Sequence, residues 1–322
     1  MRLTLKRLAL GGVALAVVVG GAASAWAGPV TTDGDLAASF MKVDRNTAWN
    51  QVDKLHLDFP TYHTEGLAIT PDHIFLSSVQ ITEPTQKYPS PVDGYDRTPG
   101  KGIGHLFVMD RQGHLQKDIT LGEGDMYHPG GIDFDGSSVW VPVAQYRPNS
   151  SAIIYKVNAK TLNVSKQFEV NDHIGGIVFD PTTHRLVGNN WGSRRFYSWT
   201  LDGTQTDTWL NPNHFIDDQD CQYVETAKML CGGVTNLPQT PSAGGAAGTY
   251  ELGGMSLTDL HTHQILHEVP FQQWSTAGHA MTRNPLKLAG NGNTIDLWAA
   301  PDNGDEGNGT ELWHFRATVP AS

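Results

Sequence analysis

The sequence predicts an all-β protein of the β-propeller class, with five four-stranded blades as the first choice. A degenerate motif returns along the 322-residue chain at spacings of 65, 45, 44 and 58 residues. Between its copies lie short runs of β-branched and aromatic residues, bounded by Gly, Asn, Asp and Pro. Units of about 45 residues with four short strands are typical of propellers, whereas parallel solenoids have shorter repeats.

The repeated motif consists of a polar residue, small residues and then an apolar strand. Its clear copies are HTEGLAI, HPGGIDF and HIGGIVF, and its degenerate copies are DDQDCQY and STAGHAM. They begin at His63, His128, His173, Asp217 and Ser275. The first strand of each propeller blade lines the central channel, so we expect these positions to form a ring at one depth.

The strands of the second unit are the easiest to place, at GGIDFD, SSVWVPVAQ, SAIIYKVN and SKQFEVN. The last unit offers only three, at GHAMTR, TIDLWAAP and ELWHFRAT. We expect DKLHLDF at residues 53–59 to supply the fourth, because pairing the two chain ends closes the ring and removes an exposed sheet edge. Six blades are the alternative, which would need strands in the helix-like DLAASFMKV segment or in the 80–104 insertion.

The N-terminus has the features of a cleavable signal peptide. Three basic residues precede a short apolar run that closes on A-W-A at Ala27. An uncleaved membrane anchor would need a longer apolar run. We therefore expect a secreted or periplasmic protein. The expected organisation is a signal peptide over residues 1–27, an extension with a short helix over 28–52 and one propeller domain over 53–322.

The net charge of −11 limits the classes of partner. Three of the 22 basic residues lie in the expected signal peptide, so the mature chain is more acidic still. Binding to nucleic acid or to an anionic membrane depends on clustered Lys and Arg, which this chain does not offer. We expect a small-molecule or glycan ligand, no nucleic-acid partner, no membrane attachment after signal cleavage, and a monomer.

The two cysteines, Cys221 and Cys231, flank a polar turn in CQYVETAKMLC. This pattern predicts a β-hairpin in which the two thiols face each other across the strands. After export such a pair oxidises readily, so we expect a disulfide. Two buried free thiols are the alternative, because the geometry of the hairpin decides whether the bond can form.

The longest insertions fall between the second and third strands of their units, at residues 80–104, 236–248 and 302–310. These connections emerge on one face of a propeller, together with the starts of the repeats, and binding residues concentrate on loops carried by a rigid scaffold. The last insertion, with Asp302, Asp305 and Glu306, has the composition of a calcium loop. Its spacing matches no EF-hand, so a solvated turn is the simpler interpretation.

Three imidazoles and a carboxylate that converge from separate blades suit a metal site or an acid–base site. Neutral imidazole binds Zn, Cu, Fe and Ni, and its pKa near neutrality suits proton transfer. The candidate catalytic residues are His63, His128 and His173. The candidate ligands of one divalent metal ion in the channel are His63, Glu65, His128, His173 and Asp217, with Asp220 and His279 in a second layer. Alternatively, such histidines are turn residues whose ring nitrogens bond the backbone and fix the blade junctions.

The same rim carries candidate ligand-binding residues. The segments AQYRPNS and GNNWGSRRF occupy equivalent places in adjacent blades, after the second strand. Arginine beside Tyr or Trp suits a planar anionic or carbonyl-bearing ligand, while salt bridges to acidic loops are the alternative. The candidates are Tyr146, Arg147, Asn190, Trp191 and Arg194. The sequence contains no G-x-S-x-G, H-E-x-x-H or strand-linked phosphate loop.

The strings HTEGLAIT, HPGGIDFDG, DHIGGIVFD, NNWGSRRFY and DDQDCQY resemble an uncharacterised family of secreted bacterial and fungal propeller proteins. The resemblance runs from about residue 50 to the C-terminus. The chain is more loosely similar to gluconolactonase and strictosidine-synthase-like propellers. That likeness implies a metal-binding role for Glu65 in T-E-G-L, although HPGG, HIGG and DQDC replace the later metal motifs of that family.

These observations lead to two hypotheses about function. The first is a secreted, hydrolase- or lyase-like enzyme that acts on a small organic molecule at the mouth of the central channel, with or without a metal ion. The second is a non-catalytic extracellular propeller that binds a carbohydrate or a protein, which the nine tryptophans also fit.

Overall fold

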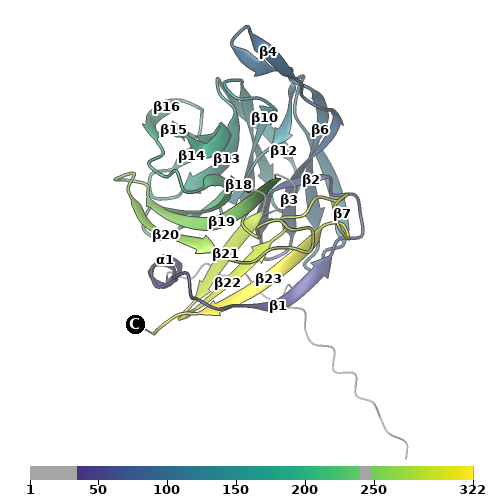
Figure 1. The fold of residues 1–322 in the computed structure, drawn as a ribbon. Helices are drawn as coiled ribbons and strands as arrows, with labels where there is room; N and C mark the ends of the chain where they lie inside the picture. The colour runs from purple at the N-terminus through teal and green to yellow at the C-terminus, as the bar shows by residue number, and fades with distance from the viewer. Residues whose placement is uncertain (1–34, 240–247, 322) are drawn as a thin grey trace, which may run out of the picture.

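The computed structural model describes residues 35–239 and 248–321, which form a five-bladed β-propeller (Figure 1). Blade 1 contains β2 (His63–Ile69), β3 (Ile74–Glu83), β6 (Lys101–Met109) and β7 (Leu115–Leu121). Blade 2 contains β8 (Met126–Pro129), β9 (Asp133–Phe134), β10 (Ser138–Gln145), β11 (Ala152–Asn158) and β12 (Val164–Val170). Blade 3 contains β13 (Ile174–Asp180), β14 (Arg185–Asn190), the 3₁₀ turn η1 (Trp191–Ser193), β15 (Arg195–Thr200) and β16 (Gln205–Leu210).

The last two blades complete the ring. Blade 4 contains β17 (Asp217–Val224), β18 (Lys228–Gln239), β19 (Gly248–Asp259) and β20 (Ile265–Phe271). Blade 5 contains β21 (Leu286–Asn291), β22 (Thr294–Ala299), β23 (Glu311–Thr318) and the N-terminal β1 (Trp49–His56). A separate hairpin of β4 (Lys87–Val92) and β5 (Tyr95–Arg97) projects from blade 1 between β3 and β6 (Figure 1). The predicted fold class, with five blades rather than six, is confirmed.

The N-terminal strand closes the ring as predicted. In Figure 1, β1 lies beside β23 near the C-terminus, and the two pair antiparallel from Trp49 with Ala317 to His56 with Glu311. The strand begins at Trp49 rather than at Asp53. Before it, the helix α1 (Leu36–Phe40) packs into the core that blades 4 and 5 share.

The innermost strand of blade 5 differs from the sequence prediction. The GHAMTR segment is a loop, and β21 takes the inner place. The reason lies in its hydrogen bonds: the Ala280 N–H donates to the side chain of Glu251, and the Met281 N–H donates to the carbonyl of Gln273. These donors are therefore not available to a neighbouring strand.

The glycines of the repeated motif let the inner strands meet at the propeller axis. A Cβ on Gly66 would lie 2.7 Å from the Cα of Gly131, and one on Gly131 would lie 2.6 Å from the carbonyl oxygen of Gln219. Gly131 also forms a parallel bridge with Gly176 of blade 3. No larger residue fits such contacts, which explains why the fourth position of each clear repeat is a glycine.

A buried carboxyl group ties the blades together at this level. Oδ2 of Asp220 accepts the N–H of Leu67 at 2.8 Å and that of Leu286 at 3.0 Å, and Oδ1 accepts the N–H of Ile132 at 3.1 Å. The donors belong to blades 1, 5 and 2, and Asp220 itself belongs to blade 4. Asp133 of blade 2 repeats the arrangement by accepting backbone N–H groups from blades 3 and 4.

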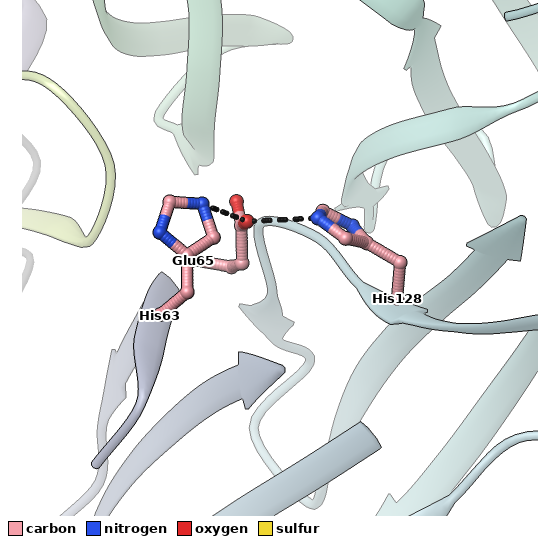
Figure 2. Close-up of side chains that lie close together, drawn as sticks. All are labelled: His63, Glu65 and His128. Atoms are coloured by element: carbon pink, nitrogen blue, oxygen red, sulfur yellow. Dashed lines mark ion pairs between the residues drawn. The ribbon is translucent and has the colours of Figure 1, made fainter. Parts of the chain in front are cut away.

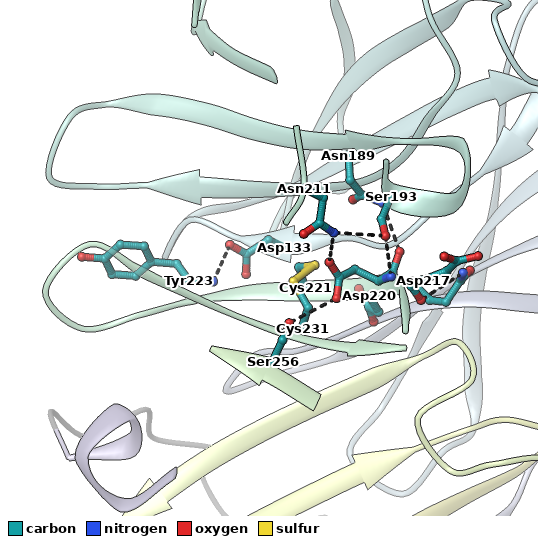
Figure 3. The surroundings of a disulfide bond; sticks show 12 residues. Asp133, Asn189, Ser193, Asn211, Asp217, Asp220, Cys221, Tyr223, Cys231 and Ser256 are labelled. Carbon is teal, nitrogen blue, oxygen red and sulfur yellow. Dashed lines mark hydrogen bonds between the residues drawn. A yellow bond between two sulfur atoms is a disulfide. The ribbon is translucent and has the colours of Figure 1, made fainter. Parts of the chain in front are cut away.

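Cys221 and Cys231 lie opposite each other on β17 and β18 and form the predicted disulfide (Figure 3). Disulfides persist in oxidising compartments, so this bond fits an extracellular protein. Among the described residues, no helix has the length and apolar character needed to cross a membrane. The predicted signal peptide over residues 1–27 lies outside the described residues.

The first prediction concerns the axial carboxyl group. The Asp220→Ala variant leaves three buried N–H groups without acceptors, and we expect it to lose at least about 3 kcal/mol of unfolding free energy. Asp220→Asn keeps one acceptor oxygen, so its loss is smaller. Urea denaturation of wild type and variants measures the effect, with the exposed Asp72→Ala as the control, for which we expect a change within about 0.5 kcal/mol. Equal midpoints for Asp220→Ala and Asp72→Ala would contradict the role of this group.

Candidate functional site

A cavity of about 460 Å³ opens at the end of the axis where the repeated motifs begin. Every blade contributes to its wall, through residues at the starts of inner strands and in the loops beside them. The cavity therefore lies where the ring of repeat starts was predicted. Its acidic and basic side chains are His63, Glu65, His128, His173, Asp217, Asp218, Glu251 and Arg283.

The wall formed by blades 1 and 2 holds a compact cluster of two histidines and a glutamate. Oε1 of Glu65 lies 2.8 Å from Nε2 of His63 and 3.1 Å from Nε2 of His128, so the carboxylate sits between the imidazoles (Figure 2). One ligand atom from each of these residues lies within 4.8 Å of the others. Within the described part of the chain, no other three His, Cys, Asp or Glu residues form such a group.

Local backbone structure accounts for this cluster. His63 and Glu65 are two positions apart on β2. A bulge between Thr64 and Gly66 changes the register of β2 with β3 at Glu65, and such bulges re-aim side chains. His128 enters from β8 of the next blade and stacks on Tyr146 at a ring distance of 4.1 Å.

The imidazoles determine the charge of Glu65. Burial would raise the pKa of Glu65, but the neighbouring His63 and His128 outweigh it and hold this pKa well below its ordinary value. Burial likewise opposes a charge on His63, yet Glu65 and a hydrogen bond to Asn303 raise the pKa of His63 above its ordinary value. The cluster thus holds an ionised carboxylate that needs a cation beside it.

The hydrogen bond to Asn303 limits what that cation can be. Nδ1 of His63 donates to Oδ1 of Asn303 at 2.8 Å, so in a neutral ring Nε2 would point a lone pair at the Glu65 carboxylate. Only a proton or a metal ion between the two atoms removes that repulsion. Nδ1 of the buried His128 has no hydrogen-bond partner among the described residues.

His173 lies beside this cluster in a different electrostatic state. Its Nδ1 donates to the carbonyl of Gln145 at 2.8 Å, which leaves a lone pair on Nε2. Burial, together with the neighbouring His128, lowers the pKa of His173 to about 3. The ring is therefore neutral at physiological pH and is a hydrogen-bond acceptor rather than an effective general base.

The predicted metal set is thus divided by the structure. His63, Glu65 and His128 come together, whereas His173 and Asp217 line the same cavity outside the three-residue group. Asp217 is held by Arg194, whose guanidinium lies 2.8 Å from Oδ1 of the carboxylate. Ser275, the fifth position of the expected ring, hydrogen-bonds to Asp302 and does not line the cavity.

The predicted ligand-binding residues are divided in the same way. Tyr146, Asn190 and Trp191 line the cavity. Arg147 instead stacks on Tyr95 of the projecting hairpin, with Cζ 3.5 Å from the ring centroid. Arg194 donates to three backbone carbonyls as well as to Asp217, so both arginines serve the rim structure.

Arg283 is the arginine that lines the cavity, and the sequence analysis did not single it out. It lies 3.6 Å from both Glu251 and Glu306, and His279 bridges the same two carboxylates at 2.9 and 3.2 Å. Glu306 therefore pairs with this rim cluster. In the other blades, polar residues lie at the start of the inner strand or just before it. If the inner strand of blade 5 had been assigned to LKLAGN, the same rule would have indicated Arg283 and Asn284 as cavity residues.

Asp218 is a second cavity residue that the sequence did not reveal. It is buried, and its carboxylate accepts hydrogen bonds from Asn211 at 3.1 Å and from Ser256 at 3.2 Å. Burial outweighs both bonds and raises the pKa of Asp218 to about 7. A carboxyl group that titrates near neutrality can exchange a proton with a ligand under physiological conditions.

Residues 28–317 match DUF6454, a family of unknown function. The chain belongs to this family. This match agrees with the resemblance to an uncharacterised family that the sequence indicated. No curated protein sequence matches the chain.

Several solved structures share the propeller arrangement at low sequence identity. A gluconolactonase from Xanthomonas campestris aligns with a TM-score of 0.47 and 12% identity over 88% of this chain and 93% of its own. A luciferin-regenerating enzyme aligns with a TM-score of 0.46 and 9% identity over 86% and 98% of the two chains. A DUF4221 protein from Bacteroides vulgatus has a TM-score of 0.39 and 10% identity over 87% and 100%. Likenesses at this level carry no conclusion about activity.

The second prediction follows from the raised pKa of Asp218. The folded protein holds this proton more tightly than the unfolded chain, so its contribution to stability is greatest at low pH and disappears as pH rises through about 7. Between pH 5.5 and 8.5 the wild type should lose about 2 kcal/mol from this group. Asp218→Asn has no such proton, so its stability relative to wild type should rise by that amount.

Denaturant titrations at both pH values measure this difference. The exposed Asp125→Asn is the matched control, because the same substitution there removes no buried carboxyl group. A stability difference between Asp218→Asn and wild type that is the same at both pH values would refute the shifted pKa.

Proposed function

We propose that this protein is a secreted enzyme that binds one divalent transition-metal ion through His63, Glu65 and His128 and acts on a small organic molecule in the axial cavity. The reaction class that suits the site is hydrolysis or elimination. The proposal rests on one observation: a buried carboxylate lies within about 3 Å of two imidazole nitrogens at the wall of an open cavity.

The donor set favours a transition metal over calcium. Two imidazoles and one carboxylate are the ligands of catalytic zinc and of non-haem iron sites, whereas calcium takes six to eight oxygen ligands. Three protein ligands leave coordination positions open toward the cavity, as catalytic sites require. A bound ion would supply a Lewis acid and a water molecule of lowered pKa.

The surroundings hold the three ligands in place. Asn303 accepts the Nδ1 proton of His63 and so presents Nε2 to the ion, which is the usual role of an outer partner of a metal-bound histidine. The ring of His128 is fixed by stacking on Tyr146. The positive charge of the metal ion would offset the negative charge of the buried Glu65 carboxylate that helps to bind it.

Three further groups can serve a substrate. Nε2 of His173 accepts a hydrogen bond without taking up a proton, because the ring stays neutral. Asp218 can donate or accept a proton near neutral pH. Arg283 can offset negative charge that develops on a substrate oxygen, since this residue lines the cavity.

A non-catalytic binding role is the second candidate, and one observation favours it. Trp191 and Tyr146 both line the axial cavity with ring centroids 5.6 Å apart, and aromatic rings at a cavity wall are groups on which a sugar ring could stack. In that case the cation between Glu65 and His63 is a proton, and a bound glycan is recovered unchanged.

The third prediction is the metal content. Protein purified without chelators or nickel affinity resin should contain about one equivalent of zinc, iron, manganese or copper by plasma mass spectrometry. Glu65→Gln and His128→Ala remove ligands and should lose the ion. Asn303→Ala removes only the outer partner of His63, so its metal affinity should fall about 10- to 100-fold.

Matched controls are the exposed Glu169→Gln and His114→Ala, which should retain the ion. The same preparations, with and without a chelator, are then assayed for cleavage of a panel of esters and lactones. Wild-type protein that contains no metal, and that cleaves panel substrates equally well with chelator, would refute metal assistance. Metal-free protein that binds glycans without changing them would establish the binding role.

A further inference from the structure

A second cavity of about 600 Å³ adjoins the axial one. Three residues line both cavities: His63, Tyr146 and Arg283. His63, which belongs to the proposed metal site, therefore lies at the boundary between the two cavities. We call the two spaces the axial cavity and the side cavity.

The side cavity has a largely apolar wall. Pro60, Tyr62, Val79, Ile81 and Tyr146 line it, and its polar lining residues include Gln80, Asn303 and Asp305. Val79 pairs with His63 across β2 and β3, and the strand continues two residues further to Ile81. The apolar surface thus begins directly beside the proposed metal site and leads away from it.

The axial cavity presents hydrogen-bond acceptors instead. The side-chain amides of Asn189, Gln219 and Asn284 each donate one N–H to a backbone carbonyl of the protein. Their carbonyl oxygens accept no hydrogen bond from the described residues. The carboxylates of Asp217 and Glu251 add further acceptors. A ligand that forms hydrogen bonds with these oxygen atoms must carry hydrogen-bond donors. In a neutral ligand, hydroxyl groups are the simplest such donors.

We propose that the ligand of this protein has two parts: a hydroxyl-rich head that occupies the axial cavity and an alkyl or aryl arm that occupies the side cavity. The junction between head and arm lies beside His63 and Arg283. This inference rests on the proposed function only for the position of the reacting bond, because recognition of head and arm requires no metal.

Isothermal titration calorimetry with alkyl β-D-glucosides tests the inference. Ethyl, butyl and hexyl glucoside share the head and differ only in the arm, and all are titrated into the full-length mature protein in the presence of a chelator. Burial of each added methylene should tighten binding about fourfold. Hexanoate carries the arm without hydroxyl groups, so it should bind at least about tenfold more weakly than hexyl glucoside.

Variants assign the two parts to the two cavities. Ile81→Glu places a charge in the side cavity and should abolish the dependence on chain length, and Ile81→Ala should weaken it without adding a charge. Ile103→Glu is the matched control: it lies on the neighbouring β6, is 38% exposed and does not line the side cavity, so the dependence should remain. Gln219→Leu should weaken all three glucosides by the same factor.

An affinity that does not change with chain length would overturn the proposed arm site. Hexanoate that binds as tightly as hexyl glucoside would overturn the hydroxyl-rich head. Both readouts use metal-free protein, so they can fail while the metal site is confirmed. Equally, they can succeed when the purified protein contains no metal, which would refute the proposed function alone.

Discussion

The structure depends on the hydrogen bonds that Asp220 makes at the propeller axis. Its carboxyl group accepts backbone N–H groups from three other blades, and these contacts are possible because glycines allow the inner strands to meet. The axis is consequently filled at this depth instead of being an open channel. The ligand cavity therefore opens at the end of the axis where the motifs begin. The strands that form its wall are joined to one another at the axis by the hydrogen bonds of Asp220.

Much of the fold follows from the repeated motif, because polar residue, small residue and apolar strand each have a physical role at the axis. The three histidines could be placed in one cavity for that reason. The inner strand of blade 5 could not be predicted from the motif. Its copy of the motif resembles the others in residue types, yet Glu251 of blade 4 takes one of its backbone donors and β21 forms further along the chain. The misplaced strand concealed Arg283, which lines the cavity just before the true inner strand.

The roles of the charged residues depend on contacts that a sequence does not specify. Arg147 and Arg194 stand beside aromatic residues in the sequence, as ligand-binding arginines often do, but they stack on the hairpin and bond to rim carbonyls. Conversely, Glu65, His63 and His128 were all candidate metal ligands in the sequence, and the structure places the Glu65 carboxylate between the two imidazoles. Burial lowers the pKa of both His63 and His173, but contact with Glu65 outweighs burial at His63 and raises its pKa, whereas the pKa of His173 stays low.

The residues of the proposed metal site and most of the other residues of the cavity wall come from different blades. Blades 1 and 2 supply the His63, Glu65 and His128 cluster, whereas blades 3, 4 and 5 supply mainly amides, carboxylates and Arg283. These residues lie on or beside the inner strands of all five blades, and the strands are joined at the axis by Asp220 and the glycine contacts. A substitution at Ile81 can therefore change which arm is accepted without moving the cluster, because Ile81 lies two residues beyond Val79, the last residue of β3 that pairs with β2.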